Sequence, residues 1–478
     1  MSRFFPDEEP RAWAALRPRT QLAIGAAFAA SRATFFAVGI RFDTARAGVM
    51  WQLLDPALLR DRLGESLLHL HAQPPLYNLA VGLASANVGA IMHAVHLALG
   101  LALALSLGAL ARRLGLSERA SALVAVGFSV SPAAVLYENL LFYTAAEPAL
   151  LVCAALFLHR FAASRRARDA AALFALLGAL VLLRSVFHLA FLALVAALIA
   201  LAAGSLRRRV LLAAAPALLV TSLWYAKNLA LFGTFSASSW AGMNLARVAL
   251  ETIPAADRAD LVARGALPPI ARHAPFRHLE TYGTALPRRA PTGVPALDQT
   301  ARPSGQPNFN HADYLDLSRR FLGASFAAMR ARPLSYASGV GRAFDVGARS
   351  PSDYWILNTN AAKITVYTRV FEGLFYGRLV GRWCLFLIAL SPIALARAAF
   401  VSLRRGARAI DPAAAVTLIF LAGTAVYATL VGNLLDVGEN NRFRFAIDPI
   451  LLVLIALALR DAARWIAGRL GHAPPQRP

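Results

Sequence analysis

The stretch AAALFALLGALVLLRSVFHLAFLALVAALIALAA, Ala170–Ala203, decides the fold of this chain. It consists of two apolar runs, Ala170–Leu183 and Ser185–Ala203, which are separated by Arg184. Each run approaches or reaches the roughly 20 residues that an α-helix needs to cross a lipid bilayer. A charged arginine is costly at the centre of a membrane, so we expect a helical hairpin whose tip, at Arg184, lies near a membrane surface.

The composition of the whole chain agrees with a membrane location. Of its 478 residues, 58% are hydrophobic and 16% are charged, and the mean hydropathy is +0.53. Soluble proteins carry roughly a quarter charged residues. The net charge of +23 comes almost entirely from arginines that flank the apolar runs, which indicates the positive-inside bias of membrane proteins and no nucleic-acid partner. Cys153 and Cys384 lie in apolar tracts and indicate neither a disulfide framework nor a metal cluster.

Arginine clusters order the apolar runs into a topology. With all six clusters on the cytoplasmic face, about ten membrane spans follow, with both termini inside. The clusters are Arg11/Arg17/Arg19, Arg112/Arg113/Arg119, Arg160–Arg168, Arg207–Arg209, Arg397–Arg408 and Arg460–Arg469. The spans are expected near residues 20–40, 90–111, 119–135, 144–161, 169–184, 186–203, 210–230, 380–399, 412–432 and 445–460.

This topology leaves three outward segments that are long or polar enough to hold chemistry. They are residues 41–89, the turn at 131–144, and the large block 232–378, which the loop at 432–445 closes. The chain therefore divides into an N-terminal transmembrane module (1–230), an extracytoplasmic domain (231–378) and C-terminal transmembrane helices (379–478). The expected fold is an all-α polytopic membrane protein with interfacial helices in the first outer loop and a small mixed external domain. No GxGxxG or P-loop motif indicates a nucleotide site.

The first outer segment ends in LLHLHAQPPLYN, Leu67–Asn78, which places two histidines, a glutamine and two prolines directly before an apolar tract. The residues from Phe42 to His71 predict two short amphipathic helices that lie along the membrane interface. Asp43 can cap the first helix, and Pro74-Pro75 ends the second and turns the chain toward the membrane. The polar residues of this stretch are thus expected at the outer mouth of a helical bundle, at the level of the lipid headgroups.

At this point the chain resembles the GT-C glycosyltransferases, membrane enzymes that use polyprenyl-phosphate sugars and include protein O-mannosyltransferases and aminoarabinose transferases. The resemblance rests on an acidic residue soon after the first span, a PPL turn about 30 residues later, and three further elements in the same order. These elements are WYAKNLALFG (Trp224–Gly233), RPLSY (Arg332–Tyr336) and ENNRFRFAIDP (Glu439–Pro449). Lys227 stands where the family usually has arginine, and Thr44 follows Asp43 where several relatives carry a second acid.

The resemblance implies that a sugar moves from a polyprenyl monophosphate to an acceptor hydroxyl or amine at the outer membrane face. Such a reaction needs a carboxylate base and cations that stabilise the departing phosphate. Asp43 matches the family position of the base; an N-cap is the plainer alternative. Glu138 or Glu147 would be the second acid, although either can be an ordinary interfacial carboxylate.

Phosphate or sugar contacts are expected from basic and polar residues near the outer surface. Arginine binds phosphate bidentately, and snorkelling to lipid headgroups and local helix capping are the plainer alternatives. The candidates are Arg442, Arg444, Arg184, Lys227, His71 and Gln73. In the external block, Ser238–Val248 and Asn308–Tyr314 mix aromatic and amide groups that suit either carbohydrate contacts or domain packing.

The expected partners are a polyprenyl-phosphate sugar donor, a glycan, lipid or protein acceptor, and the lipid bilayer. The expected location is the bacterial plasma (inner) membrane, with the active site facing the periplasm or the outside. Some relatives use a divalent metal and others do not, and the sequence shows no dedicated ligand cluster. The alternatives are a transporter or flippase of lipid-linked saccharides, a polymerase or ligase that uses a diphosphate-linked glycan, and a non-catalytic scaffold.

Overall fold

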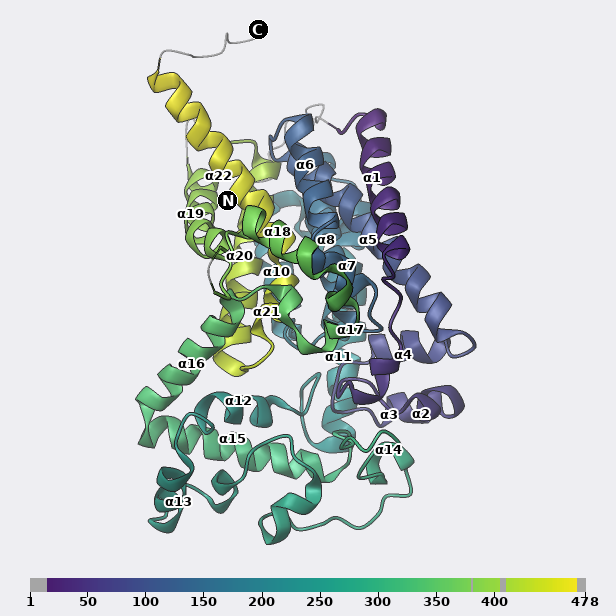
Figure 1. Ribbon diagram of the computed structural model, residues 1–478, viewed down its shortest axis with the longest axis vertical. Helices are drawn as coiled ribbons and strands as arrows, with labels where there is room; N and C mark the ends of the chain where they lie inside the picture. Colours follow the sequence, from purple (N-terminus) through teal and green to yellow (C-terminus); the bar gives the residue numbers. More distant parts are fainter. Residues whose placement is uncertain (1–14, 380, 405–409, 471–478) are drawn as a thin grey trace.

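The computed structural model describes residues 15–379, 381–404 and 410–470, which form a bundle of apolar helices with a smaller helical part at one end (Figure 1). Arg11 and Arg405–Arg408, two parts of the arginine pattern, lie outside these residues. The apolar helices are α1 (Pro18–Ala37), α5 (Val88–Arg113), α6 (Glu118–Ser129), α7 (Pro132–Glu138), α8 (Ala146–Ser164), α9 (Ala167–Leu183), α10 (Leu189–Ala202), α11 (Arg207–Phe232), α19 (Leu385–Leu403), α20 (Pro412–Leu435) and α22 (Asp448–Arg469).

The chain is a multi-pass membrane protein. In the described residues, five helical segments are long and apolar enough to cross a membrane, and α6 with α7 makes a sixth if this pair, bent by 54°, is one span. The five are Val88–Arg113, Tyr143–Ser164, Gly204–Phe232, Leu385–Leu403 and Pro412–Leu435. Each interval in which the sequence predicts a span holds a helix, and α10 is apolar but only 14 residues long.

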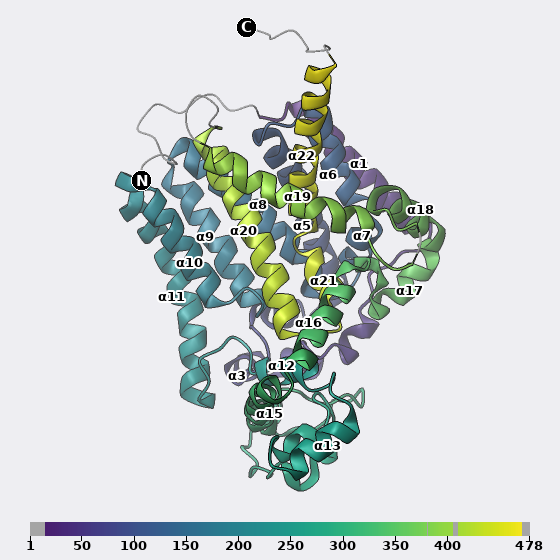
Figure 2. The same ribbon diagram turned by 90° about the vertical axis from the view of Figure 1, so that its left-hand side faces the viewer.

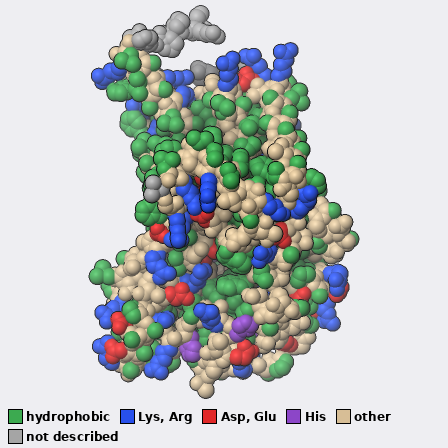
Figure 3. All heavy atoms as spheres, viewed as in Figure 1, with side chains coloured by type: hydrophobic (Ala, Val, Ile, Leu, Met, Phe, Trp, Pro, Cys, Tyr) green, Lys and Arg blue, Asp and Glu red, His purple; other side chains and the backbone are tan. Residues whose placement is uncertain are grey.

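The two ends of the bundle differ in charge. Arg17, Arg112 with Arg113, Arg160 and Arg207–Arg209 lie at or near the helix ends that are remote from the helices of the external segment. Figure 3 shows basic side chains at this upper end, a largely hydrophobic belt below it, and mixed charges on the lower part. The predicted hairpin is present, and Arg184 ends α9 at the opposite pole, next to the external segment.

The first outer segment is more broken than two amphipathic helices. Only a short 3₁₀ turn, Ala45–Val49, follows Asp43, and the second predicted helix is divided at Arg62 into α2 (Pro56–Asp61) and α3 (Leu63–Leu68). The Asp55 carboxylate accepts the backbone N–H of Ala57 and so caps α2. As expected, the prolines end this region, and α4 (Leu76–Leu83) begins directly after them.

The described part of the external segment is helical and contains no strand, although the sequence predicts a small mixed domain. Apart from the short helix α14 (Pro295–Asp298), its residues 264–312 form 3₁₀ turns and loops, in which Gly265, Gly283, Gly293 and Gly305 have positive φ. The helices are α12 (Ala241–Ala249), α13 (Ala255–Ala263), α14 (Pro295–Asp298), α15 (Asp313–Ala331) and α16 (Pro333–Ala348), followed by α17 (Asn358–Ala361) and α18 (Thr365–Tyr376). α16 leads from this part back to the bundle (Figures 1 and 2).

The core of the bundle is built around α8, which packs against α5, α9 and α20. Small and aliphatic side chains on α8, such as Val152, Ala155 and Leu158, are fully buried. Without a hydrophobic driving force inside a bilayer, helices associate by close van der Waals contact, for which small side chains are well suited. α8 therefore fixes the ends of the helices that carry the candidate site.

The external helices depend on one close crossing. α12 packs against α15 at Gly242, where an added Cβ atom would overlap the backbone carbonyl oxygen of Ser318. The atoms of α15 that such a Cβ atom would meet belong to the backbone of Ser318 and Leu322. A side-chain rotamer change therefore cannot make room for a residue larger than glycine. Gly323 on α15 has no atom within 4 Å of such a Cβ atom and makes a matched control.

We expect Gly242→Ala to separate α12 from α15 and to destabilise the protein by about 1–3 kcal/mol, the usual cost of overpacking. Gly323→Ala should be neutral or slightly stabilising, because alanine is the better helix former. The midpoint of thermal unfolding of the purified protein in detergent measures both effects. Equal midpoints for the two variants would contradict the close crossing.

Candidate functional site

A cavity of about 510 Å³ lies where the membrane bundle meets the external helices. Its walls come from the α9–α10 turn, the loop after α20, α12, α15 and the first outer segment. The lining includes the sequence candidates Gln73, Arg184 and Arg442, and also Trp51, Tyr143, His188, Trp240, Asn244, Arg247, Phe276, Asp436 and Glu439. Segments that are more than 350 residues apart in the sequence therefore share one cavity.

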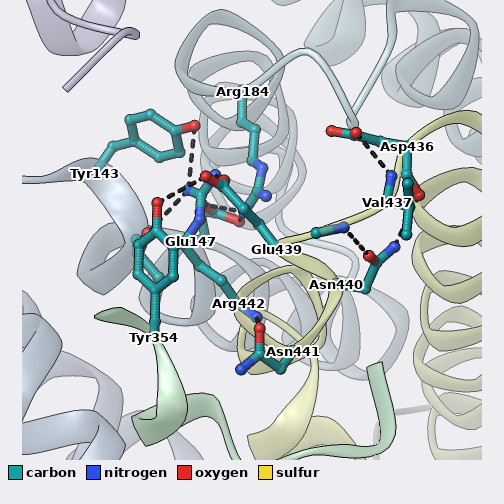
Figure 4. Close-up of polar contacts among 12 residues, drawn as sticks. Tyr143, Glu147, Arg184, Tyr354, Asp436, Val437, Glu439, Asn440, Asn441 and Arg442 are labelled. Carbon is teal, nitrogen blue, oxygen red and sulfur yellow. Dashed lines mark hydrogen bonds and ion pairs between the residues drawn. The ribbon is translucent and has the colours of Figure 1, made fainter. Parts of the chain in front are cut away.

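Arg442 is the most deeply buried cation of the cavity, with 1% of the residue's surface exposed. It projects from the short helix α21 (Asn440–Phe445), which follows α20 through a loop that Asn440 braces by donating to Gly432 O. Its guanidinium pairs with Glu439 and donates to Tyr143 Oη and Thr144 Oγ1, both at 3.3 Å (Figure 4). Its Nε has no hydrogen-bond partner among the described residues.

Arg184 brings a second buried guanidinium to the same cavity. Because α9 ends at this residue, the side chain can turn toward α8, where it pairs with both carboxylate oxygens of Glu147. It also lies over the ring of Phe443, 4.4 Å from the ring centroid. Its Nη2 is buried and has no partner in the part of the chain that the structure describes.

The two guanidiniums flank one aromatic ring. The Arg184 and Arg442 guanidinium carbons lie 5.6 Å and 5.5 Å from the centroid of the Tyr143 ring. Each arginine is paired with a single carboxylate and keeps a buried N–H group without a partner. Buried donors are costly unless they are satisfied, so this wall of the cavity is suited to an anion such as phosphate.

Two carboxylates, Asp436 and Glu439, line the same cavity as the arginines. Burial raises the pKa of Asp436 to about 6, although Arg247, at 3.2 Å, opposes this shift. Burial also acts to raise the pKa of Glu439, but Arg442 and a hydrogen bond from Tyr354 outweigh it and lower this pKa below its ordinary value. Asp436 can therefore exchange a proton near neutral pH, whereas Glu439 stays ionised and holds Arg442 in place.

Aromatic and amide side chains complete the cavity on the side of the external segment. The rings of Trp51 and Phe276 stack at 5.4 Å, and Trp240 packs edge-on against Phe276. With Asn244 and Gln73 they give a largely apolar wall with a few polar groups, as ligand-binding cavities usually have. Of the two aromatic and amide-rich stretches, Ser238–Val248 contributes to this lining, whereas Asn308–Tyr314 braces the domain.

Asp43 is absent from the lining of this cavity. Its carboxylate accepts the backbone N–H of Ala45 at 2.9 Å and lies 4.0 Å from Arg46, so it caps its own turn. Its backbone pairs with Asn139 and Leu141, just before Tyr143, and its side chain is 12% exposed. The role of Asp43 as a base stays a prediction.

The two other acidic candidates are engaged in ion pairs. Glu138 accepts two hydrogen bonds of 2.7 Å from Arg32 and lines a separate, small cavity with His96. Glu147 lies behind Arg184, is fully buried and does not line the central cavity. The structure thus separates these acids and places only Glu147 in contact with a residue of the site.

Three basic candidates lie away from the cavity. Arg444 pairs with Asp448 at 2.9 Å and donates to Gly347 O. Lys227 donates to Leu70 O at 2.6 Å and lies over the Trp224 ring. His71 is buried and contacts Ser239 Oγ through Nδ1 at 2.8 Å, and burial lowers its pKa to about 3.

The stretch LLHLHAQPPLYN connects the first outer segment to the external segment through hydrogen bonds. Asn310 accepts the backbone N–H groups of His71 and Ala72 and donates to His69 O. Ser238 donates to Ala72 O at 2.5 Å. The stretch therefore holds Gln73 at the cavity, while the histidines themselves serve packing and backbone contacts.

The sequence indicated no role for three of the lining residues, Arg247, Asp436 and Glu439. They lie in one cavity because the fold brings α12, which carries Arg247, next to the end of α20 and the loop after it. The sequence signal that could have indicated Asp436 and Glu439 is their position, three residues apart in GNLLDVGENNRFRF and just before the two arginines.

In the described residues no group of three or more His, Cys, Asp or Glu residues could hold a metal ion.

Comparisons with known proteins identify no family. No model of a known protein family matches the chain, and no curated protein matches it. Among solved structures, the fold is similar to that of the archaeal oligosaccharyltransferase AglB from Archaeoglobus fulgidus in complex with an inhibitory peptide and a dolichol-phosphate, with a TM-score of 0.41 and 13% sequence identity. The similarity covers 96% of this chain, which spans about half (52%) of the length of AglB.

The buried pair of Arg184 and Glu147 predicts an asymmetric response to mutation. Glu147→Gln leaves a buried guanidinium without its counter-charge and should destabilise the protein by about 3–5 kcal/mol. The double variant Glu147→Leu with Arg184→Met removes both charges and should recover much of this loss. Thermal unfolding in detergent measures the difference.

The exposed pair of Asp260 and Arg264 is the control, because surface ion pairs contribute about 0–1 kcal/mol. Asp260→Ala should leave the unfolding midpoint nearly unchanged. A double variant at positions 147 and 184 that is as unstable as Glu147→Gln would contradict the predicted asymmetry.

Proposed function

We propose that this protein transfers a sugar from a polyprenyl-monophosphate donor to an acceptor at the extracytoplasmic face of the membrane. The observation that carries the proposal is the pair of buried guanidiniums, Arg184 and Arg442, which line one cavity together with a carboxylate of raised pKa, Asp436. The motif resemblance to GT-C glycosyltransferases supplies the reaction class. Ten membrane spans, with the arginine-rich ends in the cytoplasm, would place this cavity on the outer side.

The proposed step is a displacement at the anomeric carbon. The acceptor oxygen or nitrogen forms a bond to this carbon, the bond from the carbon to the phosphate oxygen breaks, and the electron pair stays with the phosphate. A carboxylate takes the acceptor proton. Arg184 and Arg442 stabilise the charge that grows on the leaving phosphate, for which fixed donors in a buried site are effective.

Two carboxylates are candidates for the base, on different grounds. Asp43 has the position that the resemblance implies, just after the first span. Asp436 lines the same cavity as the two arginines, and its raised pKa of about 6 suits proton exchange. The geometry favours Asp436, and Glu439 serves to position Arg442.

Arg442→Gln should weaken the binding of a polyprenyl monophosphate at least tenfold, because a charge-assisted contact to the phosphate is lost. Arg442→Lys should recover only part of the affinity, because an ammonium group cannot bind phosphate bidentately. Titration of the purified protein with undecaprenyl phosphate, followed by native mass spectrometry, measures this.

Arg330→Gln, on an exposed part of α15, is the control and should keep full affinity. Equal affinity of Arg442→Gln and the wild-type protein would remove the phosphate role of this residue. Tighter binding of a diphosphate-linked glycan than of the monophosphate would favour the polymerase or ligase alternative.

With a panel of polyprenyl-phosphate-linked hexoses and pentoses, and a membrane extract as acceptor, the release of polyprenyl phosphate should rise as the pH passes through about 6. The sign follows from the raised pKa of Asp436, which is protonated below this value and able to accept a proton above it. Asp436→Asn should lower turnover by roughly 10²–10⁴ without loss of donor binding, the range of general base catalysis.

Asp43→Asn is the paired variant in the same assay and should retain most of the activity. The reverse result, loss of turnover in Asp43→Asn and retention in Asp436→Asn, would return the base to the position that the resemblance implies. No release of polyprenyl phosphate from any donor of the panel would overturn the transferase assignment.

A further inference from the structure

A second cavity, of about 830 Å³, lies on the other side of the loop that carries Arg442. Gly438 and Asn441 of this loop line it, whereas Asp436, Glu439 and Arg442 line the central cavity. Tyr354 separates the two spaces, because it lines the second cavity and donates to Glu439 at 2.7 Å. The second cavity is thus a separate space, open to the surface and bordered by the end of α16, by α17 and α18, and by residues just before α19.

Four arginines line the second cavity: Arg349, Arg369, Arg378 and Arg382. The carboxylates around it are already engaged. Arg349 pairs with Asp345, and Arg378 pairs with both Asp353 and Glu372, at 2.9 and 2.7 Å. Glu372 also accepts hydrogen bonds from Ser350 and Ser352.

Arg369 and Arg382 are the uncompensated charges of this cavity. Neither has a hydrogen bond or an ion pair to any described residue, and Arg382 acts on Asp345 only through longer-range attraction. Thr368 Oγ1 and Arg349 Nε are buried and have no partner within the same part of the chain. The cavity therefore offers two free guanidinium groups, those of Arg369 and Arg382, to an anion.

The second cavity lies at the level of the membrane interface. α19 is one of the candidate membrane spans, and its 19 residues rise about 28 Å, close to the hydrocarbon thickness of a bilayer. Arg382 and Trp383 directly precede it, and exposed tryptophans are typical of the headgroup level. Lipid phosphates are therefore expected within a few ångströms of these arginines.

A lipid-facing helix borders the cavity. On α18, Val366, Val370 and Leu374 form an exposed apolar stripe with exposed fractions of 76%, 56% and 69%. Arg369 lies between the first two of these residues in the sequence and also lines the cavity. In Figure 3 basic side chains gather at mid-height on this face, where the hydrophobic belt meets the mixed surface of the lower part.

We propose that this second cavity is a binding site for the anionic phosphate headgroup of a bilayer lipid, with Arg369 and Arg382 as its principal contacts and the acyl chains along α18. The site does not depend on the proposed sugar transfer. Single snorkelling arginines contact lipids without saturation. A cavity lined by four arginines, two of them without a carboxylate partner among the described residues, predicts saturable binding and preference for a net negative headgroup.

The test uses the full-length protein, stripped of lipid in detergent and titrated with phosphatidylglycerol, phosphatidylcholine or inorganic phosphate. Native mass spectrometry counts the bound lipid. The wild-type protein should bind phosphatidylglycerol at least tenfold more tightly than the zwitterionic phosphatidylcholine. Millimolar inorganic phosphate should not displace it, because a free anion lacks the contact with α18.

The double variant R369A/R382A should weaken phosphatidylglycerol binding at least tenfold, to the level of phosphatidylcholine. R330A/R342A removes the same charge from exposed positions on α15 and α16 and should stay within twofold of the wild-type protein. Thermal unfolding without lipid checks that the variants fold, which we expect because the substituted side chains are exposed. R369A alone should show an intermediate loss of affinity.

Three outcomes would overturn the proposal. Unchanged phosphatidylglycerol binding by R369A/R382A would remove the site, and an equal loss in R330A/R342A would reduce it to general surface charge. Displacement of the lipid by inorganic phosphate at an equal concentration would make it a site for a soluble anion. None of these measurements uses a sugar donor. They therefore test the lipid site even if the proposed sugar transfer is wrong.

Discussion

The central constraint on this structure is the burial of two guanidinium groups where the membrane bundle ends. Each ion is expensive to remove from water, and a buried arginine is stable only when a counter-charge and hydrogen bonds accompany it. Arg184 meets this requirement through Glu147, at the start of α8, and Arg442 meets it through Glu439 and the hydroxyl groups of Tyr143 and Thr144. The ion pair of Arg184 with Glu147 therefore fixes the α9–α10 turn against α8, and the hydrogen bonds of Arg442 fix the segment after α20 against the turn that precedes α8.

The external segment closes the site from the other side because it is bonded to the first outer segment. Arg302, which is buried, donates to Met50 O and Trp51 O at 2.7 and 3.1 Å. Asn310 binds the backbone from His69 to Ala72. These contacts hold Trp51 and Gln73 at the cavity, so the aromatic wall and the cationic wall face each other although they come from different parts of the chain.

The loop after α20 lies between two cavities with different properties. On one side, paired arginines and a carboxylate of raised pKa face an aromatic wall, which suits a reaction on a bound ligand. On the other side, four arginines line a cavity beside α18, which carries an exposed apolar stripe. The hydrogen bond from Tyr354, which lines the second cavity, to Glu439, which lines the first, connects the two walls.

The sequence alone determined the membrane fold. Apolar runs of span length and arginines at one end of each run encode helix positions locally, because a bilayer accepts little else. The hairpin around Arg184, the all-helical class of the membrane part and the intervals of the apolar helices could therefore be predicted, and in the described part of the chain five or six of these helices are long and apolar enough to cross a membrane. The secondary structure of the external segment could not be predicted, because its Pro- and Gly-rich loops show neither helical nor strand periodicity of apolar residues. Its packing depends on long-range contacts, such as that of Gly242 with Ser318.

The composition of the site was decided by tertiary structure. Arg442, Arg184 and Gln73 could be selected from charge, position and motif, but their shared cavity depends on the packing of α8, α9 and α20. Arg444, two residues from Arg442, pairs with Asp448 and does not line the cavity. The sequence motif alone does not show which of the two arginines enters the site. Asp436 and Arg247 become a pair only because α12 lies beside α20. Local sequence fixes where a helix begins and which residues are charged, whereas the partner of each charge depends on long-range packing.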